Sequence, residues 1–183
     1  GHIENDPSPT EGVKRVVGIS TDKACEPSST YGLSKAAMER MFLGANDFSG
    51  DTEFSVVRYG NVVGSTGSFI AKLWAERDST DPVKVTNPDM TRFWMRPKDA
   101  VAIVAFAAAC ANNIIFVPSL PALRNEEVVE TICPGRARVV VGERAGEKMH
   151  ESLISDHEAR SAFHTSGYIA IDARIRTNDF GDE

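Results

Sequence analysis

A tyrosine and a lysine four residues apart, Tyr31 and Lys35, could carry acid–base chemistry in this chain. This spacing places two side chains on the same face of a helix. The positive charge of a nearby lysine favours the phenolate form of a tyrosine, so Tyr31 could act as a base toward a hydroxyl group near neutral pH. The same Y-x-x-x-K spacing also occurs by chance on helix surfaces, where it forms a plain surface pair.

A polar tetrad lies just before this pair, at the end of an apolar run. Residues 13–20 (VKRVVGIS) are rich in β-branched side chains, as expected of a strand buried on both faces of a parallel sheet. Ligands bind beyond the carboxyl ends of the strands in such a sheet, which favours an active site at this point. The tetrad, Ser20-Thr21-Asp22-Lys23, thus forms a candidate active site together with Tyr31 and Lys35.

Two further clusters could bind a ligand. Asn61 follows the next apolar run, so it can face the same crevice, and Gly64 and Gly67 permit a close backbone approach. Arg92 and Arg144 lie on separate segments, and a guanidinium group matches phosphate oxygens with two parallel hydrogen bonds. Ordinary turn glycines and solvated surface arginines would explain these residues without a ligand.

The elements that must position these residues alternate between strands and helices. Hydrophobic spacing predicts strands at 13–20, 53–63, 114–117, 138–141 and 168–171. It predicts helices at 31–48, 69–77, 100–111 with its first turn at Pro97, 125–132 and 147–154. This order predicts an α/β fold, in which a parallel sheet with crossover helices is followed by a smaller lobe of mixed structure.

Composition excludes several classes of protein. The 183 residues carry 20 Lys and Arg against 26 Asp and Glu, a net charge of −6, which argues against nucleic-acid or acidic-membrane partners. The longest nearly uninterrupted apolar run, 100–111, is too short to span a bilayer, and residues 1–12 resemble a loose leader or tag remnant without a signal peptide's apolar core. We therefore predict a cytoplasmic protein whose folded part is 13–183.

Other reactive residue types have no supporting pattern. The cysteines at 25, 110 and 133 lack C-x-x-C spacing, and three histidines spaced seven apart do not share one helical turn, so we predict no metal site. Cys25 has no histidine near it in the sequence, which argues against a nucleophile. Trp74 and Trp94 are expected to be packing residues.

Four segments, in this order, resemble one family: STDKACEPSSTYGLSK, FSVVRYGNVVGSTGS, NPDMTRFWM and GEKMHE. From residue 13 to about 155 the chain resembles the extended short-chain dehydrogenase/reductase family. Within it, the chain is most similar to the UDP-N-acetylglucosamine 4,6-dehydratases of bacterial flagellin and capsule sugar synthesis. Agreement of four motifs makes the resemblance specific. Glucose-type dehydratases of similar fold carry Asp-Glu where this chain has Asp22 and Lys23, which narrows the match.

The resemblance implies a reaction and a role for each residue. Tyr31, assisted by Lys35 and Thr21, would take the proton of the sugar 4-hydroxyl while the hydride passes to NADP, which Tyr31 and Lys35 would contact. Asp22 and Lys23 would then act as acid and base in the loss of water across carbons 5 and 6, before the hydride returns to carbon 6. The implied contacts to the UDP-sugar are Asn61, Val62, Arg92, Arg144 and Glu147. Thr66 and Ala145 replace the family's usual arginine and proline, which weakens the expected substrate anchoring.

One family feature is missing from the sequence. It contains no G-x-x-G-x-x-G or G-x-G-x-x-G turn, which would bind the cofactor's pyrophosphate. In family terms the chain begins just before the fifth strand. We therefore expect a partial Rossmann-like parallel sheet, made of the C-terminal strands only, with a small mixed α/β substrate lobe.

The missing strands would leave the first strand, 13–20, with an unpaired apolar edge. We expect this edge to bind a second copy of the chain or a complementing N-terminal chain. Two functions stay open at this point. The chain is a dehydratase or part of one, or it is a catalytically inactive fragment that keeps a sugar-nucleotide or protein interaction surface.

Overall fold

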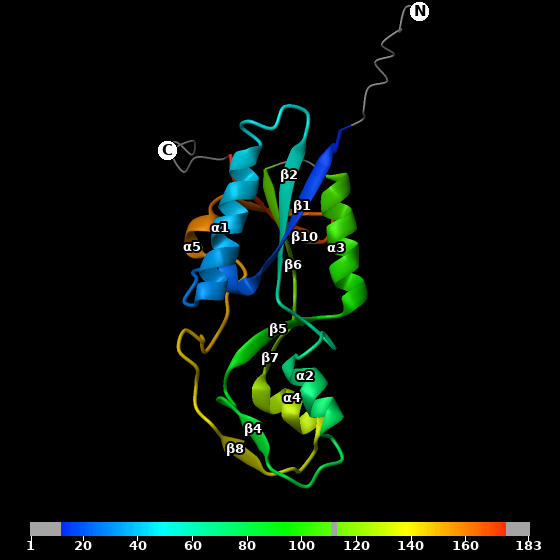
Figure 1. The fold of residues 1–183 in the computed structure, drawn as a ribbon, viewed down its shortest axis with the longest axis vertical. Coiled ribbons are helices and arrows are strands. Elements are labelled where there is room, and N and C mark those ends of the chain that lie inside the picture. The colour runs from blue at the N-terminus through cyan, green and yellow to red at the C-terminus, as the bar shows by residue number, and fades with distance from the viewer. Residues whose placement is uncertain (1–11, 111–112, 175–183) are drawn as a thin grey trace, which may run out of the picture.

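A five-stranded sheet forms the upper half of the molecule (Figure 1). This computed structural model describes residues 12–110 and 113–174. The strand order is β1 (Arg15–Thr21), β2 (Glu53–Tyr59), β6 (Ile114–Pro118), β10 (Tyr168–Asp172) and β9 (Ala162–Thr165). The predicted parallel pairing is confirmed for β1, β2 and β6, whereas β10 runs antiparallel to both of its neighbours. A two-residue turn, Ser166-Gly167, with positive φ at both positions joins β9 to β10, and so short a connection requires antiparallel strands.

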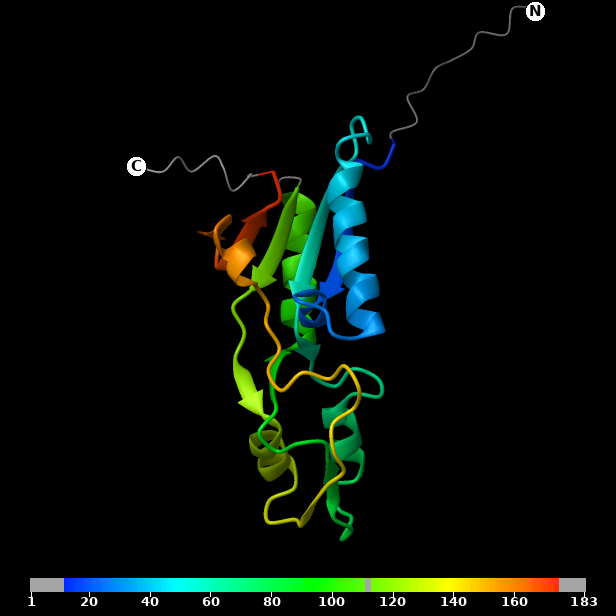
Figure 2. The same ribbon diagram turned by 90° about the vertical axis from the view of Figure 1, so that its left-hand side faces the viewer.

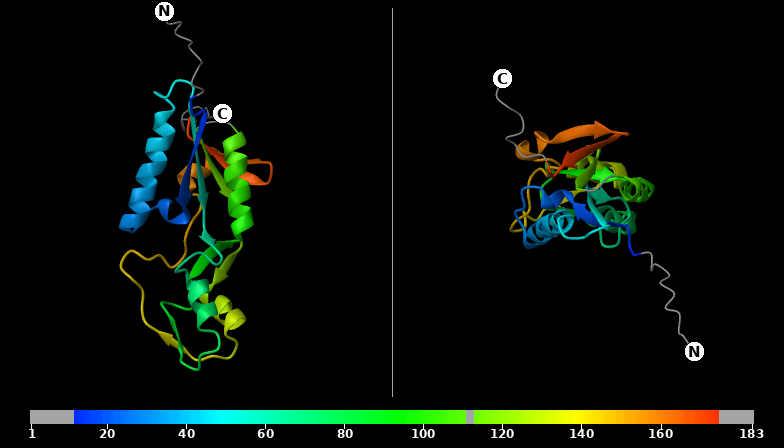
Figure 3. Two further views of the ribbon diagram at one scale, coloured as in Figure 1. Left: turned by 45° about the vertical axis from the view of Figure 1, so that its right-hand side comes forward. Right: turned by 90° about the horizontal axis from the view of Figure 1, so that it is seen from above.

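Two helices cover opposite faces of this sheet (Figures 1 and 3). Helix α1 (Thr30–Ala45) packs on β1 and β2, and α3 (Pro97–Ala109) packs on β1, β2 and β6 from the other side. Helix α1 is shorter than predicted because the Asn46 side chain exchanges hydrogen bonds with the Phe54 backbone. The predicted end of α3 at 111 lies outside the described residues, as do residues 1–11 of the expected leader.

Strand β1 lies at the end of the strand order. Its register with β2 runs from Arg15 opposite Glu53 to Thr21 opposite Tyr59, so the carboxyl ends of the two strands meet as predicted. Within residues 12–110 and 113–174, no strand pairs with the other edge of β1. The expectation of burial on both faces is only partly met. Ile19 is 36% exposed, because a strand with one neighbour is covered less completely than a central strand.

The lower half of the molecule, here called the small lobe, consists of residues 61–95 and 122–140 (Figure 1). Helices α2 (Phe69–Ala75) and α4 (Asn125–Ile132) lie where the sequence predicts them. Five short strands complete the lobe: β3 (Asn61–Val62), β4 (Val83–Val85), β5 (Thr91–Met95), β7 (Ala122–Arg124) and β8 (Arg138–Val140). Strand β8 was predicted, and β3 falls within the strand predicted at 53–63. Strands β4, β5 and β7 were not predicted, since so few residues give no clear alternation of polar and apolar side chains.

The lobe has an apolar core of its own, in which Trp94 packs with Leu73, Val85 and Val129. Trp94 is therefore the packing residue that was predicted. Trp74 is not, because it is 60% exposed on the outer side of α2 and the guanidinium carbon of Arg77 lies 5.1 Å from its ring centre.

The strand predicted at 53–63 is split at Gly60. Strand β2 ends at Tyr59 in the large sheet, and β3 then pairs with β5 in the small lobe. A Cβ atom at position 60 would lie 2.5 Å from the Cβ of Phe93 and 2.7 Å from its carbonyl oxygen. The chain therefore requires glycine at position 60, where it crosses from β2 to β3.

A long return segment, residues 141–155, runs from β8 back to the large sheet (Figure 2). The helix predicted at 147–154 is wrong, since this segment is irregular and forms only a single β-bridge, between His150 and Thr91. Backbone groups of this segment form hydrogen bonds to other elements and not the repeated hydrogen bonds of a helix. The Met149 carbonyl, for example, accepts a hydrogen bond from Arg92. The short helix α5 (Asp156–Ala159) begins only after Ser155, which caps it. No helix within the described ranges is long and apolar enough to cross a membrane.

The close approach at Gly60 yields a stability prediction. We expect Gly60→Ala to lower the free energy of unfolding by about 1–3 kcal/mol, because the added methyl group meets the Phe93 backbone. The matched control is Gly44→Ala in α1, where nothing lies within 4 Å of the new Cβ. This control should raise the free energy of unfolding by up to about 1 kcal/mol. Urea denaturation followed by circular dichroism measures both, and equal effects of the two substitutions would contradict the explanation.

Candidate active site

A cavity of about 450 Å³ lies at the carboxyl ends of β1 and β2. We call it the strand-end cavity. Six of the predicted site residues line it: Thr21, Lys23, Tyr31, Lys35, Asn61 and Val62. They come from β1, the 3₁₀ turn η1 (Asp22–Ala24), α1 and β3, so the crossing of the chain at Gly60 is what brings the β3 residues to the same space. The structure thus places together residues that lie up to about forty positions apart.

Asp22 is predicted to be catalytic but does not line this cavity. Its side chain is fully buried, and its Oδ1 accepts hydrogen bonds from Thr21 Oγ1 at 2.8 Å and from Lys23 Nζ at 3.0 Å. Lys23 Nζ also lies 3.5 Å from Asn61 Oδ1. The ammonium group of Lys23 is therefore the part of the Asp-Lys pair that faces the cavity, and Asp22 lies behind it.

Tyr31 and Lys35 lie on one side of the cavity, as their spacing predicts. Tyr31 is exposed, while Lys35 Nζ donates a 2.9 Å hydrogen bond to the carbonyl of Ile19 near the end of β1. This bond fixes a positive charge at the strand end. Tyr59, to which sequence reasoning gave no role, also lines the cavity. Burial raises the pKa of its phenol and the nearby Tyr31 raises it further, so Tyr59 is a hydrogen-bond donor at neutral pH.

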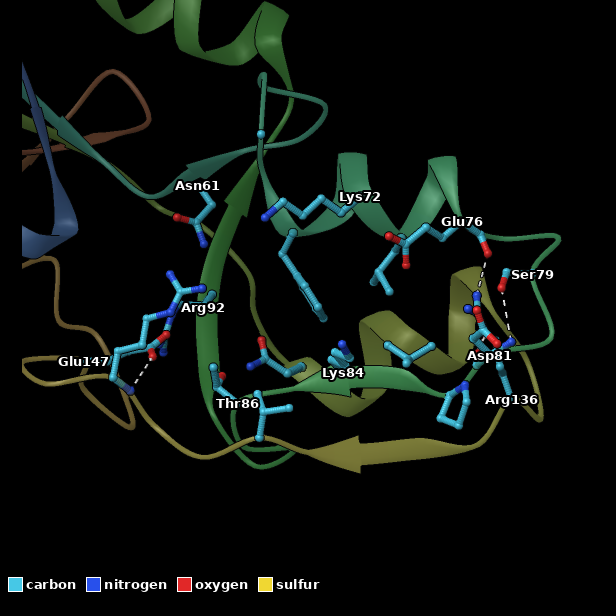
Figure 4. A pocket seen from close by; sticks show the side chains of 18 of the residues that line it. Asn61, Lys72, Glu76, Ser79, Asp81, Lys84, Thr86, Arg92, Arg136 and Glu147 are labelled. Carbon is cyan, nitrogen blue, oxygen red and sulfur yellow. Dashed lines mark hydrogen bonds and ion pairs between the residues drawn. The ribbon is translucent and has the colours of Figure 1, made fainter.

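A second cavity, of about 760 Å³, lies in the small lobe and is called the lobe cavity (Figure 4). It shares Asn61, Gly67, Phe69 and Trp94 with the strand-end cavity, so the two adjoin. Three further predicted residues line it: Arg92, Arg144 and Glu147. Val62, predicted with them, lines only the strand-end cavity.

Arg92 is a buried, partnered arginine, so it is not a solvated surface side chain. Its NH2 group lies 3.2 Å from Glu147 Oε1, and its NH1 group donates to the carbonyls of Thr91 and Met149. Glu147 Oε2 in turn accepts a hydrogen bond from the backbone N–H of Arg144. Glu147 thus connects the two arginines that the sequence placed on separate segments.

The lobe cavity has an excess of positive charge. Its cationic residues are Lys72, Lys84, Arg92, Arg136 and Arg144, and its acidic residues are Glu76, Asp81 and Glu147. In Figure 4 the side chains of Asn61, Lys72 and Arg92 point into the same open space. Five positive charges against three suit an anionic ligand such as a diphosphate, although the whole chain is acidic.

A buried ion-pair network lies behind the strand-end cavity. Arg58 of β2 is 2% exposed, and its guanidinium group donates to Glu39 at 2.9 and 2.6 Å, to Glu158 twice at 2.8 Å, and to the Leu153 carbonyl at 2.9 Å. Ser20, the residue before Thr21, donates to the same Glu39 carboxylate. The network therefore joins β1, β2, α1 and α5 next to the predicted catalytic turn.

Two titratable groups near this network have strongly shifted pKa values. Burial alone would raise the pKa of Glu158, but the hydrogen bonds and charge of Arg58, together with Ser155, outweigh it and lower the pKa to about 2. Burial raises the pKa of Cys25 to about 12, so its thiolate is scarce at neutral pH.

Among the residues that the structure describes, no cluster of histidine, cysteine and acidic side chains could hold a metal ion.

Sequence reasoning also assigned no role to Lys148 and Glu151. Glu151 Oε1 lies 3.9 Å from Lys23 Nζ, and Glu151 Oε2 lies 3.7 Å from Lys148 Nζ. Both residues belong to the GEKMHE motif, in which only Glu147 received a predicted role. The motif could have indicated a role for Glu151. The helix wrongly predicted at 147–154 gave no reason to expect its contact with Lys23.

Comparison with known proteins gives one family and several relatives. The family described as polysaccharide biosynthesis protein matches residues 6–173. A UDP-N-acetylglucosamine 4,6-dehydratase (inverting) from Campylobacter jejuni is 38% identical over 174 residues, which cover 92% of this chain and 52% of that protein. A UDP-glucose 4-epimerase from Rickettsia rickettsii is 36% identical over 166 residues, covering 87% of this chain and 49% of that protein. The chain thus spans about half the length of the curated relatives it matches.

Solved structures share the fold. Pen from Bacillus thuringiensis has a TM-score of 0.84 at 28% identity, over 90% of this chain and 54% of that one. DesIV from Streptomyces venezuelae, a dTDP-glucose 4,6-dehydratase with NAD bound, has a TM-score of 0.67 over 81% of this chain and 54% of that one. Its identity is 22%, so this likeness establishes the fold alone.

The low pKa of Glu158 predicts a pH-dependent stability. A carboxylate whose pKa is about 2 in the folded protein and 4.5 when unfolded stabilises the fold above pH 4.5, and this stabilisation is lost as the pH falls through 2. The full loss is about 3 kcal/mol. Urea denaturation between pH 6 and pH 2.5 should show a steeper decline for the wild type than for Glu158→Gln.

The control for this prediction is Asp51→Asn, which changes an exposed acid near the other end of β2. This variant should keep the wild-type pH dependence. Parallel pH curves for the wild type and Glu158→Gln would contradict the role assigned to Arg58.

Proposed function

The chain belongs to the polysaccharide biosynthesis protein family, which lies among the NAD-dependent epimerases and dehydratases, and from this premise we propose that it acts on a nucleotide sugar. The proposed reaction is the 4,6-dehydration of UDP-N-acetylglucosamine. The observation that carries the proposal is the junction of two cavities at Asn61, one with an excess of positive charge and one with the Tyr31, Lys35 and Lys23 side chains.

The two cavities fit the two ends of such a substrate. The diphosphate would lie in the lobe cavity near Arg92 and Arg144, where two guanidinium groups can bind its oxygens. The sugar would then extend past Asn61 and Val62 into the strand-end cavity. Glu147, which holds Arg92 by an ion pair, would keep that guanidinium in place for the phosphate.

The chemistry follows from the residues that face the sugar. Tyr31 would take the proton of the 4-hydroxyl, with the Lys35 charge and the Thr21 hydroxyl assisting. Oxidation at carbon 4 acidifies the proton on carbon 5, and Lys23 with Asp22 would serve as acid and base in the loss of water across carbons 5 and 6. A bound nicotinamide would supply the hydride acceptor and donor.

The residues present fit one end of a nicotinamide dinucleotide. The exposed Tyr31 phenol and the Lys35 ammonium, which uses one of its three N–H groups on Ile19, could contact the ribose beside the nicotinamide. The sequence has no glycine-rich turn for the pyrophosphate, so we propose that residues outside these 183 supply that contact. The proposed cofactor is NADP. The dTDP-glucose 4,6-dehydratase DesIV, which shares the fold, was solved with NAD instead.

The missing glycine-rich turn also favours a second candidate function. A chain that binds the sugar nucleotide without the cofactor would be catalytically inactive and would act through its sugar-nucleotide or protein interaction surface. A titration with NADP and an assay for a 4-keto product distinguish the two. Product formed by the wild type and lost in Tyr31→Phe supports the dehydratase, whereas nucleotide-sugar binding without cofactor binding supports the inactive chain.

The proposed diphosphate site predicts an effect on binding. Calorimetry should detect UDP-N-acetylglucosamine binding to the wild-type chain, and Arg144→Gln should weaken it about tenfold, the value of one charged hydrogen bond. Arg160→Gln, which changes an exposed arginine just after α5 that lines neither cavity, is the control and should bind like the wild type. Absence of binding by the wild type would overturn the proposed diphosphate site and leave only a protein interaction surface for the second candidate function.

The free edge of β1 predicts self-association or pairing with a complementing chain. An unpaired strand edge with apolar side chains offers hydrogen bonds to another strand. Light scattering at micromolar concentration should therefore give a mass above that of the monomer. A compact monomer that does not bind the apolar dye ANS would show that the edge of β1 does not pair with another chain.

A further inference from the structure

We propose that Glu151 is a positioning residue that holds the ammonium group of Lys23 in the strand-end cavity. The role rests on the proposed function, in which Lys23 acts on the sugar. The Glu151 side chain is 4% exposed, and its Oε1 lies 3.9 Å from Lys23 Nζ. It reaches Lys23 from the return segment, 128 positions along the chain, so the contact exists only in the folded protein.

Lys148 holds Glu151 on its other side. Lys148 Nζ lies 3.7 Å from Glu151 Oε2 and donates a 2.7 Å hydrogen bond to the carbonyl of Cys25. Cys25 is the residue that ends the η1 turn, which carries Asp22 and Lys23. The return segment is thus attached to this turn twice, once through the Lys148 ammonium and once through the Glu151 carboxylate.

The surroundings of Glu151 differ from those of Glu39 and Glu158, and resemble those of Asp22, whose Oδ2 also has no hydrogen-bond partner in the described residues. Glu39 and Glu158 accept short hydrogen bonds from Arg58 on both of their oxygens. Glu151 Oε2, in contrast, has no hydrogen-bond partner in the described part of the chain, and both of its ion pairs are longer than 3.5 Å. A buried carboxylate with such loose partners contributes little to stability, which favours a role in the site over a role in the fold.

The role follows from the acceptors around Lys23. Its flexible four-carbon side chain ends among oxygens from three elements: Asp22 Oδ1 at 3.0 Å, Asn61 Oδ1 at 3.5 Å and Glu151 Oε1 at 3.9 Å. Two of these oxygens accept hydrogen bonds from the ammonium ion, and the Glu151 carboxylate adds an ion pair on a further side, so together they restrict its position. The other ionisable groups on the same cavity are Tyr31 and Lys35 of α1 and Tyr59 of β2.

This arrangement also connects the two cavities. Glu147, which binds Arg92 in the lobe cavity, lies four residues before Glu151 on the same segment. The return segment therefore supplies contacts to residues of both cavities, through Glu147 to Arg92 and through Glu151 to Lys23.

Competitive labelling of lysines with acetic anhydride tests the role on the whole chain, with mass spectrometry reading each lysine. In Glu151→Gln we expect Lys23 labelling to rise at least threefold relative to the exposed Lys14, because loss of the carboxylate removes the ion pair that restricts the Lys23 side chain. Lys35, which lines the same cavity but bonds to Ile19, should change less than twofold. Unchanged Lys23 labelling, or an equal rise at Lys35, would overturn the proposal.

Two more variants keep the test decisive. Glu143→Gln removes an exposed acid of the same segment that bonds to Asn87, and it should leave Lys23 labelling unchanged. Glu151→Asp keeps the charge on a shorter side chain and should give a smaller, Lys23-specific rise; it decides the question if Glu151→Gln does not fold. Labelling needs neither cofactor nor turnover, so the proposed function, which the 4-keto assay and the nucleotide-sugar titration test, and the role of Glu151 stand or fall separately.

Discussion

The arrangement of the site depends on one buried guanidinium group. Arg58 forms five hydrogen bonds, one from Nε and two from each terminal nitrogen, and so uses every N–H that it has. An arginine in this position is stable only if all of these partners are present, because an unpaired charge in the interior is costly. β2, α1 and α5 must therefore meet at a fixed geometry, and the turn that carries Asp22 and Lys23 is attached to the same cluster through Ser20 and Glu39.

Local sequence predicted the elements that local forces determine. The β-branched run predicted β1, and Pro97 predicted the start of α3. The expected parallel pairing of β1 with β2 also predicted that Asn61 lies close to Lys23. Arg58 stood in a motif that sequence reasoning quoted, but its acidic partners lie 19 and 100 residues away, and nothing local identifies them. Pairings at such distances depend on the tertiary fold, which is also why the return segment was wrongly predicted to be helical.

The charge of the lobe cavity differs in sign from that of the whole chain. A net charge of −6 excludes a general affinity for polyanions, yet five cationic side chains surround this one space. A single small anion needs only a local excess of positive charge, and ion pairs such as Arg92 with Glu147 orient the cations that provide it. Family membership and cavity charge thus both support the proposal of a phosphate-containing ligand.

The separation of Arg58 from Glu158 has a consequence for synthesis of the protein on the ribosome. Glu39 is translated before Arg58, but Glu158 follows it by 100 residues. At about 5–20 residues per second, the nascent chain carries this arginine for about 5–20 seconds with only one of its two carboxylate partners made. The large sheet also lacks β6 for about the first half of that interval, and β9 and β10 for all of it. The emerging chain therefore has to keep β1 and β2 from aggregating until its last third has been translated, and this is the stage at which a chaperone would have most to protect.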